Sequence, residues 1–282
     1  MIRLLFICCL LFSSDALSQN ALNPDRNEPL EVTADKSLEW NRSEMYFKAR
    51  QNVRAVQGDT TLTSDILTAK YRDGKKGMDI HTLLADGHVR INSAQSRAYG
   101  DHATYKVDKG YAVMTGRKLR LISDGQTVTA RDKFQYWVNT GRLEAIGSAV
   151  AVRLGDKLEA DKLIATFTED KKGKRTLKAL EAIGNVVITT PTEVLTGELA
   201  IYQASTNIAK IHDNVKITRG PNVLEGDSAQ VNLDTNISKI FGGAGETGRV
   251  RGVFYPGSET KPKIEPVLNS NDSQGNKSAG EE

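Results

Sequence analysis

The sequence predicts an all-β fold, an open antiparallel β-jelly roll that is V-shaped, built from repeats and almost free of helix. Three observations predict it. Apolar and polar residues alternate with period two over most of the chain, which buries one face of a strand. An acidic residue recurs at similar spacings, and short polar turns such as Asn139–Thr140–Gly141 separate the alternating runs. Short turns join antiparallel neighbours.

The first residues of the 282-residue chain are typical of an exported protein. Arg3 is followed by an apolar run that ends near Phe12, and small residues come soon after it. The run is shorter than the ~20 residues that span a bilayer. We therefore predict that residues 1–18 form a cleaved signal peptide, followed by a flexible segment over residues 19–29. Both cysteines, Cys8 and Cys9, lie in the signal segment, so the processed chain would need no disulfides.

An acidic residue marks each repeat of the chain. The acids are spaced by 36, 31, 29, 37 and 29 residues. The positions two, four and six residues after each acid are apolar or aromatic in all eighteen cases, and most residues between them are polar. Each acid thus opens a strand with one buried face. The six acids are Asp65, Asp101, Asp132, Asp161, Glu198 and Asp227.

The residues before each acid predict a bend. Three residues before the acid the residue is again apolar in most repeats, such as Leu62 before Asp65. An odd spacing separates it from the inward residues after the acid, so in a straight strand it would face the other side. A straight strand cannot bury both sets on one face. We expect a bulge or corner at the small residue that usually precedes the acid, such as Ser64.

The stretch Leu-Glu-Ala-Ile-Gly predicts a second bend. It occurs at residues 143–147 and again at residues 180–184, each time inside an apolar alternation. The alternation resumes at Val186 after Gly184, but one residue later, at Val150 and Val152, after Gly147. We interpret each glycine as a bend that every repeat shares.

The repeats set the expected domain limits. We predict one β-jelly-roll domain over residues 30–255 and a disordered tail over residues 256–282, which is rich in Ser, Asn, Gly and charged residues. A stack of antiparallel strands leaves an unpaired edge at each end. The expected edges are the first strand, residues 31–40, and the last strand, residues 238–243.

At this point the sequence resembles a known family. Residues 30–71 contain Ala34–Asp35, a short apolar strand from Met45, Asn52–Val53, and Ser64–Asp65 followed by Tyr71. This order resembles the opening of the OstA-like domain of the LptA family of periplasmic lipopolysaccharide-transport proteins. The resemblance extends through the repeats to about Gly245.

The resemblance implies a function and partners. It implies a periplasmic protein that binds lipopolysaccharide, shields the acyl chains of lipid A in an apolar groove, and carries the lipid from the inner to the outer membrane. The implied partners are an LptC-like protein anchored in the inner membrane, an LptD-like translocon of the outer membrane, and further copies of the chain joined head to tail through edge strands. It implies no cofactor, no metal and no catalytic residue.

The alternation and the resemblance together give eighteen residues that we expect to line the groove. All are apolar or aromatic and lie at inward positions of the proposed strands. They are Phe47, Val53, Leu67, Tyr71, Val89, Tyr105, Val107, Met114, Leu121, Phe134, Tyr136, Val152, Leu163, Phe167, Val186, Tyr202, Ile217 and Val231.

Other functions fit the sequence less well. A net charge of +3 is too small to indicate a nucleic-acid partner. The stacked acids could suggest an enzyme on a β-solenoid, but they occupy equivalent places in the repeats, and no catalytic or phosphate-binding motif is present. Basic clusters at residues 75–76, 117–120 and 171–175 could meet lipid phosphates or serve only for solubility. The remaining alternative is an exported structural or adhesive β-solenoid that binds no lipid.

Overall fold

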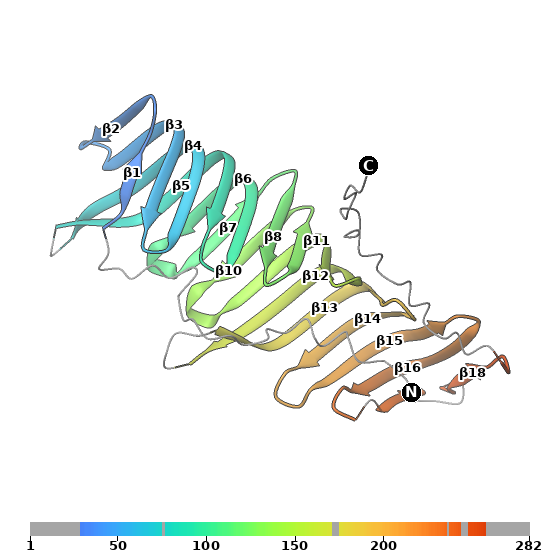
Figure 1. Ribbon diagram of the computed structural model, residues 1–282. Helices are drawn as coiled ribbons and strands as arrows, with labels where there is room; N and C mark the ends of the chain where they lie inside the picture. Colours follow the sequence, from blue (N-terminus) through green and yellow to red (C-terminus); the bar gives the residue numbers. More distant parts are fainter. Residues whose placement is uncertain (1–28, 75–76, 171–174, 236, 244–247, 258–282) are drawn as a thin grey trace, which may run out of the picture.

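The computed structural model describes residues 29–74, 77–170, 175–235, 237–243 and 248–257. In this part of the chain eighteen strands form one sheet, and the only helical elements are two 3₁₀ turns. The sheet is elongated, with β1 and β2 at one end and β17 and β18 at the other (Figure 1). The all-β class is confirmed, whereas the jelly-roll designation stays a prediction.

Most strands are long and follow one another along the chain. The elements are β1 (Glu31–Thr33), β2 (Ser37–Asn41), β3 (Tyr46–Gln57), β4 (Thr60–Gly74), β5 (Gly77–Asn92), β6 (Ser96–Lys106), η1 (Val107–Lys109), β7 (Tyr111–Thr115), β8 (Leu119–Ser123), β9 (Gln126–Ala130), β10 (Lys133–Trp137), η2 (Val138–Thr140), β11 (Arg142–Arg153), β12 (Asp156–Glu169), β13 (Arg175–Thr189), β14 (Val194–Gln203), β15 (Ile208–Arg219), β16 (Asn222–Asn232), β17 (Ile237–Phe241) and β18 (Arg251–Val253).

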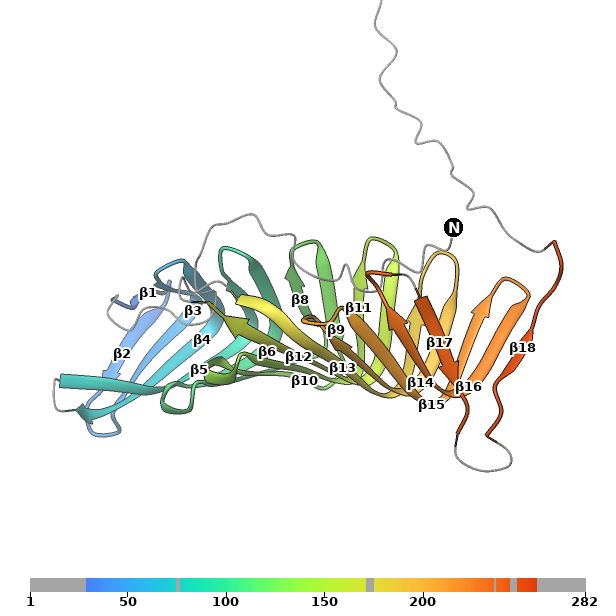
Figure 2. The ribbon, with the colours of Figure 1, turned by 90° about the horizontal axis from the view of Figure 1, so that it is seen from below.

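The sheet consists of two walls that meet at a corner. In β3, residues 46–50 pair with β2, and residues 54–56 pair with β1. At the other end, residues 228–232 of β16 pair with β17, and residues 223–225 pair with β18. We call the wall that holds β2, β7, β10 and β17 the first wall, and the wall that holds β1, β8, β9 and β18 the second wall. The other strands cross the corner. In Figure 2 the hairpin turns of the second wall rise along the upper side.

The corner is made by a repeated bulge. In β3, β5, β11, β13 and β15 the register shifts so that two residues face one acidic residue of the next strand. In each of these strands both bulge residues have positive φ. Examples are Gly147 (89°) and Ser148 (43°) in β11, and Gly184 (77°) and Asn185 (50°) in β13. Two residues against one is a β-bulge, which bends the strand and increases its twist. The bends predicted at Gly147 and Gly184 are therefore confirmed.

The bulge predicted beside each acid lies on the neighbouring strand instead. The sequence placed the extra residue next to the acid, for example at Ser64 before Asp65. The structure places it on the neighbouring strand, at Gln51 and Asn52 of β3, while β4 contributes the single residue Asp65. Gln51 and Asn52 adopt φ of 69° and 47°, and asparagine tolerates this left-handed backbone better than most residues.

The register predicted after Gly147 was wrong. The inward residues are Ala149 and Ala151, which are 0% and 7% exposed, whereas Val152 is 40% exposed on the outer face. The pattern after Gly147 thus matches that after Gly184, where Val186 is buried. A late resumption does occur after Gly116. There Gly116, Arg117 and Lys118 separate β7 from β8, and the first buried residue is Leu119.

The inward faces of both walls form one apolar core. A single cluster of buried side chains extends from Ala49 in β3 to Ala229 in β16. Alanine and valine predominate close to the corner, at the inward positions that lie nearest to the bulges along each strand. The core is thus continuous along the sheet, with each repeat packing on the next.

The backbone at Gly147 provides the first testable prediction. A Cβ atom there would lie 2.2 Å from Oδ2 of Asp132, and φ is 89°. Left-handed backbone costs an L-residue about 1–2 kcal/mol. We expect Gly147→Ala to lower the free energy of unfolding by more than this amount, as measured by urea denaturation.

Gly155→Ala is the matched control. Gly155 has a similar φ of 93°, but a Cβ atom there meets nothing within 4 Å. Gly155→Ala should lower the free energy of unfolding only by the cost of the left-handed backbone. Equal losses at Gly147 and Gly155 would show that the contact with Asp132 has no energetic consequence.

Candidate functional site

The structure places seventeen of the eighteen predicted groove residues on the inward face and one outside it. Val152 is the exception, because the register after Gly147 directs its side chain outward. Phe47, Tyr105, Val107, Leu121 and Phe167 are half-buried. The buried residues are Val53, Leu67, Tyr71, Val89, Met114, Phe134, Tyr136, Leu163, Val186, Tyr202, Ile217 and Val231.

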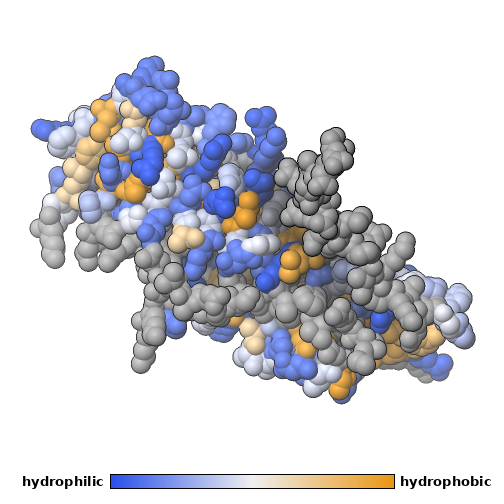
Figure 3. All heavy atoms as spheres, viewed as in Figure 1, coloured by the Kyte–Doolittle hydropathy of each residue, from blue (hydrophilic) through white to orange (hydrophobic). Residues whose placement is uncertain are grey.

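The core brings many of these residues together. Eight of them belong to the long cluster, and Leu121 packs against it. Tyr202 and Val231 belong to a second, smaller cluster near β14 to β16. Over β2 to β5, Figure 3 shows apolar side chains gathered on the visible face and bordered by hydrophilic ones. The eight residues of the long cluster are Val53, Leu67, Val89, Met114, Phe134, Leu163, Val186 and Ile217.

The free margin of the first wall is aromatic, and its polar tips are paired. Trp40 donates a hydrogen bond from Nε1 to the hydroxyl of Tyr71 over 2.8 Å. Phe47 lies between them, 5.3 Å from each ring. Farther along, the hydroxyl of Tyr202 donates to Asn207 over 3.0 Å. We call the free margin of each wall, away from the corner, its lip.

Tyr136 on the same lip is held by an arginine. Arg175 donates a hydrogen bond to the hydroxyl of Tyr136 and lies 5.6 Å from the centre of its ring. The same guanidinium forms an ion pair with Glu169 over 2.9 Å. The arginine thus has both an aromatic and an anionic partner, which fixes its position at the lip.

The lip of the second wall carries charged residues that the sequence reasoning missed. We call Arg153, Asp156, Glu193 and Arg219 the polar row. Each is two residues from a buried apolar residue of its own wall, respectively Ala151, Leu158, Leu195 and Ile217. That even spacing puts their side chains on the inward face, and it was the signal that could have identified them.

The row crosses neighbouring strands at one level. Arg153 of β11 is directly paired with Asp156 of β12. The turn from β13 to β14 closes with a hydrogen bond from the amide of Thr190 to the carbonyl of Glu193. Val194 of β14 is paired with Thr218 of β15. Because these strands are antiparallel, Glu193 and Arg219 lie opposite each other, one residue beyond that pair.

The two carboxyl groups of the row are desolvated, whereas Arg153 and Arg219 are half-buried. Asp156 and Glu193 are each 6% exposed, and burial raises the pKa of both carboxyl groups. The charge of Arg219 partly offsets this for Glu193 by lowering its pKa. Nη1 of Arg153 is buried and has no hydrogen-bond partner among the described residues. A buried donor without a partner carries a desolvation penalty, so it needs an explanation.

Of the described residues in the predicted basic clusters, Arg117 and Arg120 do not share this inward position. Residues 75–76 and 171–174 lie outside the described residues, and Arg175 of the third cluster holds Tyr136. In the remaining cluster Leu119 is buried, whereas Arg117 and Arg120 are exposed. Arg120 lies 4.8 Å from the ring centre of Tyr99 on the outer face of the second wall. That cluster therefore faces away from the apolar core.

The acidic residues at the corner form side-chain contacts with the bulges. Asn52 donates to Asp35 over 2.7 Å, and Asn185 donates to Asp161 over 2.9 Å. His88 lies 2.8 Å from Asp65 through Nδ1. Within the described residues no group of three or more His, Cys, Asp or Glu side chains could hold a metal ion. The acids thus act locally in the bend.

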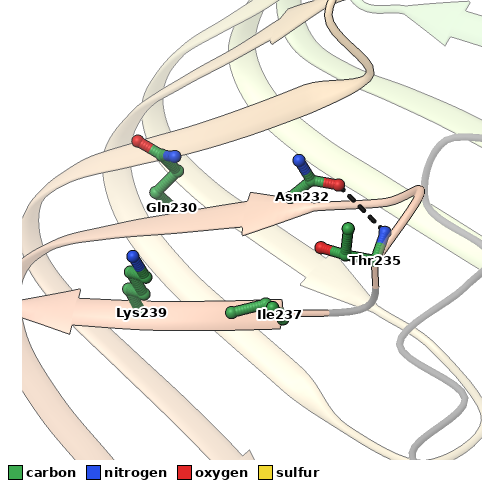
Figure 4. Close-up of a pocket in the computed structure, with 5 residues that line it drawn as sticks. All are labelled: Gln230, Asn232, Thr235, Ile237 and Lys239. Atoms are coloured by element: carbon green, nitrogen blue, oxygen red, sulfur yellow. Dashed lines mark hydrogen bonds between the residues drawn. The ribbon is translucent and has the colours of Figure 1, made fainter.

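A small depression lies outside both walls. It has a volume of about 270 Å³ on the outer face of the last hairpin, between β16 and β17 (Figure 4). Most of its lining residues are polar or charged types, of which mainly the apolar atoms face the depression. The lining residues are Gln230, Asn232, Thr235, Ile237 and Lys239.

The ends of the sheet are open edges among the described strands. β1 and β2 pair only with β3, and β17 and β18 pair only with β16. The predicted first edge strand is thus two short strands, one for each wall. The predicted last strand corresponds to β17, and β18 was not predicted. In the described part of the chain, no helix is long and apolar enough to cross a membrane.

Comparison with known proteins identifies the family. A family model described as "LptA/(LptD N-terminal domain) LPS transport protein" matches residues 31–142 and 130–237, well over half of the chain. An uncharacterized protein of Rhizobium meliloti (strain 1021) is 27% identical over 157 residues, covering 51% of this chain and 83% of that protein.

A solved structure also matches. It is the crystal structure of LptH, the LptA homologous periplasmic component of the lipopolysaccharide transport device from Pseudomonas aeruginosa. The sequences are 14% identical, and the match covers 83% of this chain and 99% of that one with a TM-score of 0.21. At that TM-score the likeness supports no conclusion, so the family assignment rests on the family model.

The burial of Asp156 generates a pH-dependent prediction. Its pKa is raised in the folded state, so folding takes up a proton between the ordinary pKa and the raised one. Stability therefore falls as pH rises through that window. We expect Asp156→Asn to raise the free energy of unfolding by about 1 kcal/mol at neutral pH and to have little effect below the ordinary pKa. Urea denaturation at both pH values measures this.

Glu144 is a control with the opposite sign. Burial opposes its ionisation, but hydrogen bonds from Lys162 and Arg142 outweigh burial and lower its pKa. Glu144→Gln should therefore destabilise the protein at neutral pH, and the difference should shrink as pH falls through the lowered pKa. A destabilising effect of Asp156→Asn at neutral pH would contradict the assignment of an unfavourable buried charge.

Proposed function

Because the chain belongs to the LptA/LptD N-terminal domain family of lipopolysaccharide-transport proteins, we propose that it is a periplasmic bridge protein. In this proposal it shields the acyl chains of lipid A between its two walls and carries lipopolysaccharide from the inner to the outer membrane. The observation that carries the proposal is the apolar inward face, which is continuous from β3 to β16.

The apolar face suits this task energetically. Exposing a methylene group to water costs about 0.8 kcal/mol. A chain of about twelve carbons would thus cost roughly 10 kcal/mol on the same scale. A surface that replaces water along the whole path removes most of this cost without any catalytic group. The proposal therefore assigns no enzymatic activity and no cofactor.

Acyl chains would enter along the lips. The strand pairings lie within one wall or within strands that cross the corner, so among the described strands no backbone ladder joins the two lips. Small residues such as Ala149, Ala151 and Ala182 line the deep part of the interior. Separating the walls at the corner would make room for chains while leaving the ladders intact.

The open edges support assembly into a bridge. An unpaired edge strand can add a strand from another chain through main-chain hydrogen bonds. We propose that one edge meets an LptC-like protein of the inner membrane, that the other meets an LptD-like translocon, and that copies of the chain join head to tail between them. The exposed apolar residues Leu38 and Trp40 at one end and Ile237 and Phe241 at the other support contacts there.

Photo-crosslinking in a Gram-negative envelope tests lipid binding. A photoreactive residue at Phe134 or Tyr202 should give a glycolipid adduct, because both side chains face inward and are buried. The matched controls are Gln135 and Gln203, each the next residue on the same strand and facing outward. They should give no adduct.

The contrary result is also defined. If neither inward position gives an adduct while a known lipid-binding protein does so in the same preparation, lipid binding is refuted. That result would favour the alternative, an exported structural or adhesive β-solenoid that binds no lipid.

Disulfide trapping tests the bridge. The only natural cysteines, Cys8 and Cys9, lie in the expected signal peptide. Glu39→Cys in β2 and Lys239→Cys in β17 place one thiol at the middle of each edge strand. The double variant should form a ladder of oxidised multimers on non-reducing gels, because each chain has two ends.

The single variants serve as controls for the trapping. In a head-to-tail contact the single thiol of each faces the other edge strand, which carries none, so each should stay monomeric. Dimers of either single variant, or a double variant that forms no multimers beyond a dimer, would contradict head-to-tail assembly through these edges.

A further inference from the structure

The two lips of the interior differ in chemistry. The first wall ends in aromatic rings whose hydroxyl groups are already paired, as for Tyr71 and Tyr202. The second wall ends in the polar row, which includes a buried nitrogen of Arg153 that has no partner in the described part of the chain. An amphiphile between the walls would therefore meet aromatic rings and Arg175 on the first wall, and the buried carboxyl groups of the polar row on the second wall.

The polar row continues into neutral polar residues on both flanks. Arg153 neighbours the hairpin of Gln126 and Ser123, which are directly paired. At the other end Arg219 is directly paired with Asn222. The row thus mixes cations, carboxylates and uncharged groups at one level of the second wall, and every charged member lies beside buried apolar residues.

The mixture of groups indicates the kind of ligand. A phosphate presents only acceptors and negative charge, so Asp156 and Glu193 would repel it. A sugar hydroxyl both donates and accepts, so it can bind a carboxylate and a guanidinium together. Two cations and two carboxylates give no net charge when all are ionised, which suits an uncharged polyhydroxyl headgroup.

We propose that the polar row binds the sugar hydroxyls of a glycolipid headgroup, with Arg153 donating to a hydroxyl oxygen and Asp156 and Glu193 accepting from hydroxyl groups. The proposal rests on the proposed lipid-binding function and adds an orientation to it. The acyl chains lie toward the corner and the first wall, and the headgroup lies at the second lip between β11 and β15.

The competing explanation is purely structural. In that case the row only stabilises the hairpin turns of the second wall, and the unpaired nitrogen of Arg153 has no ligand. The two explanations differ in one property. Only the headgroup site makes the protein discriminate between amphiphiles that have the same tail.

The test compares dodecyl maltoside with dodecyl phosphate, both below their micelle concentrations, by isothermal titration calorimetry on the processed chain. The wild type should bind the maltoside about five- to tenfold more tightly, the effect of about one hydrogen bond. Arg153→Gln and Glu193→Gln should each reduce this ratio toward one. Glu193→Gln should also strengthen binding of the phosphate, because it removes a negative charge.

Lys157→Gln is the matched control. Lys157 follows Asp156 on β12, but its side chain forms an ion pair with Glu159 on the outer face. It should keep the wild-type ratio. If Arg153→Gln fails to fold by circular dichroism, the isosteric Glu193→Gln decides.

The outcomes separate this proposal from the lipid-binding function. A wild-type preference for the phosphate overturns the headgroup site, as does a ratio that both row variants leave unchanged, while lipid binding stands. Failure of the wild type to bind either amphiphile contradicts lipid binding itself, and the headgroup site with it.

Discussion

The architecture depends on one backbone constraint, the stacking of equivalent bulges at the corner. Neighbouring strands of a sheet share hydrogen bonds, so one strand cannot bend unless its neighbours bend at the same level. Five strands meet this requirement with two left-handed residues opposite one acid. Side chains reinforce the alignment, as when Asn185 donates to Asp161. The regular spacing of acids in the sequence is therefore a consequence of the fold, since each acid must reach the same line.

The bend also determines what the interior can be. Because every strand changes direction at the corner, residues before and after it face each other across a narrow space, and small side chains such as Ala149 and Ala160 fit there. Toward the lips the space between the walls is less constrained, which suits the larger Tyr71 and Tyr136 on the first wall. The interior is thus graded from small aliphatic residues to aromatic residues on one wall and polar residues on the other.

Much of this could be predicted from the sequence, because period-two alternation reports directly on burial. It correctly identified the inward face at Phe134, Leu163 and Val186. It failed at Val152, because the run Ala149–Val152 is apolar at every position, and hydrophobicity favours the valines. Only the bulge determines which of these four residues face inward. The sequence did not reveal that Ser148 adopts the left-handed backbone that completes the bulge. The polar row was missed for a related reason: Arg153 and Asp156 look like ordinary turn residues until the register shows which face they occupy.

The position of the polar row bears on how a ligand could move. In the proposed function, units that repeat the same apolar surface would offer a lipid tail similar binding free energy at each step, so the tail could pass along them without a deep minimum. Such a path would give no direction by itself, and net movement would have to be driven from outside the chain. The row breaks the equivalence, because the inward charged groups Arg153, Asp156, Glu193 and Arg219 are confined to strands β11 to β15 and the turns that join them. A headgroup bound there would pause in the C-terminal half of the sheet. The aliphatic part of the interior would then serve for passage, and the second lip would hold the ligand in one orientation.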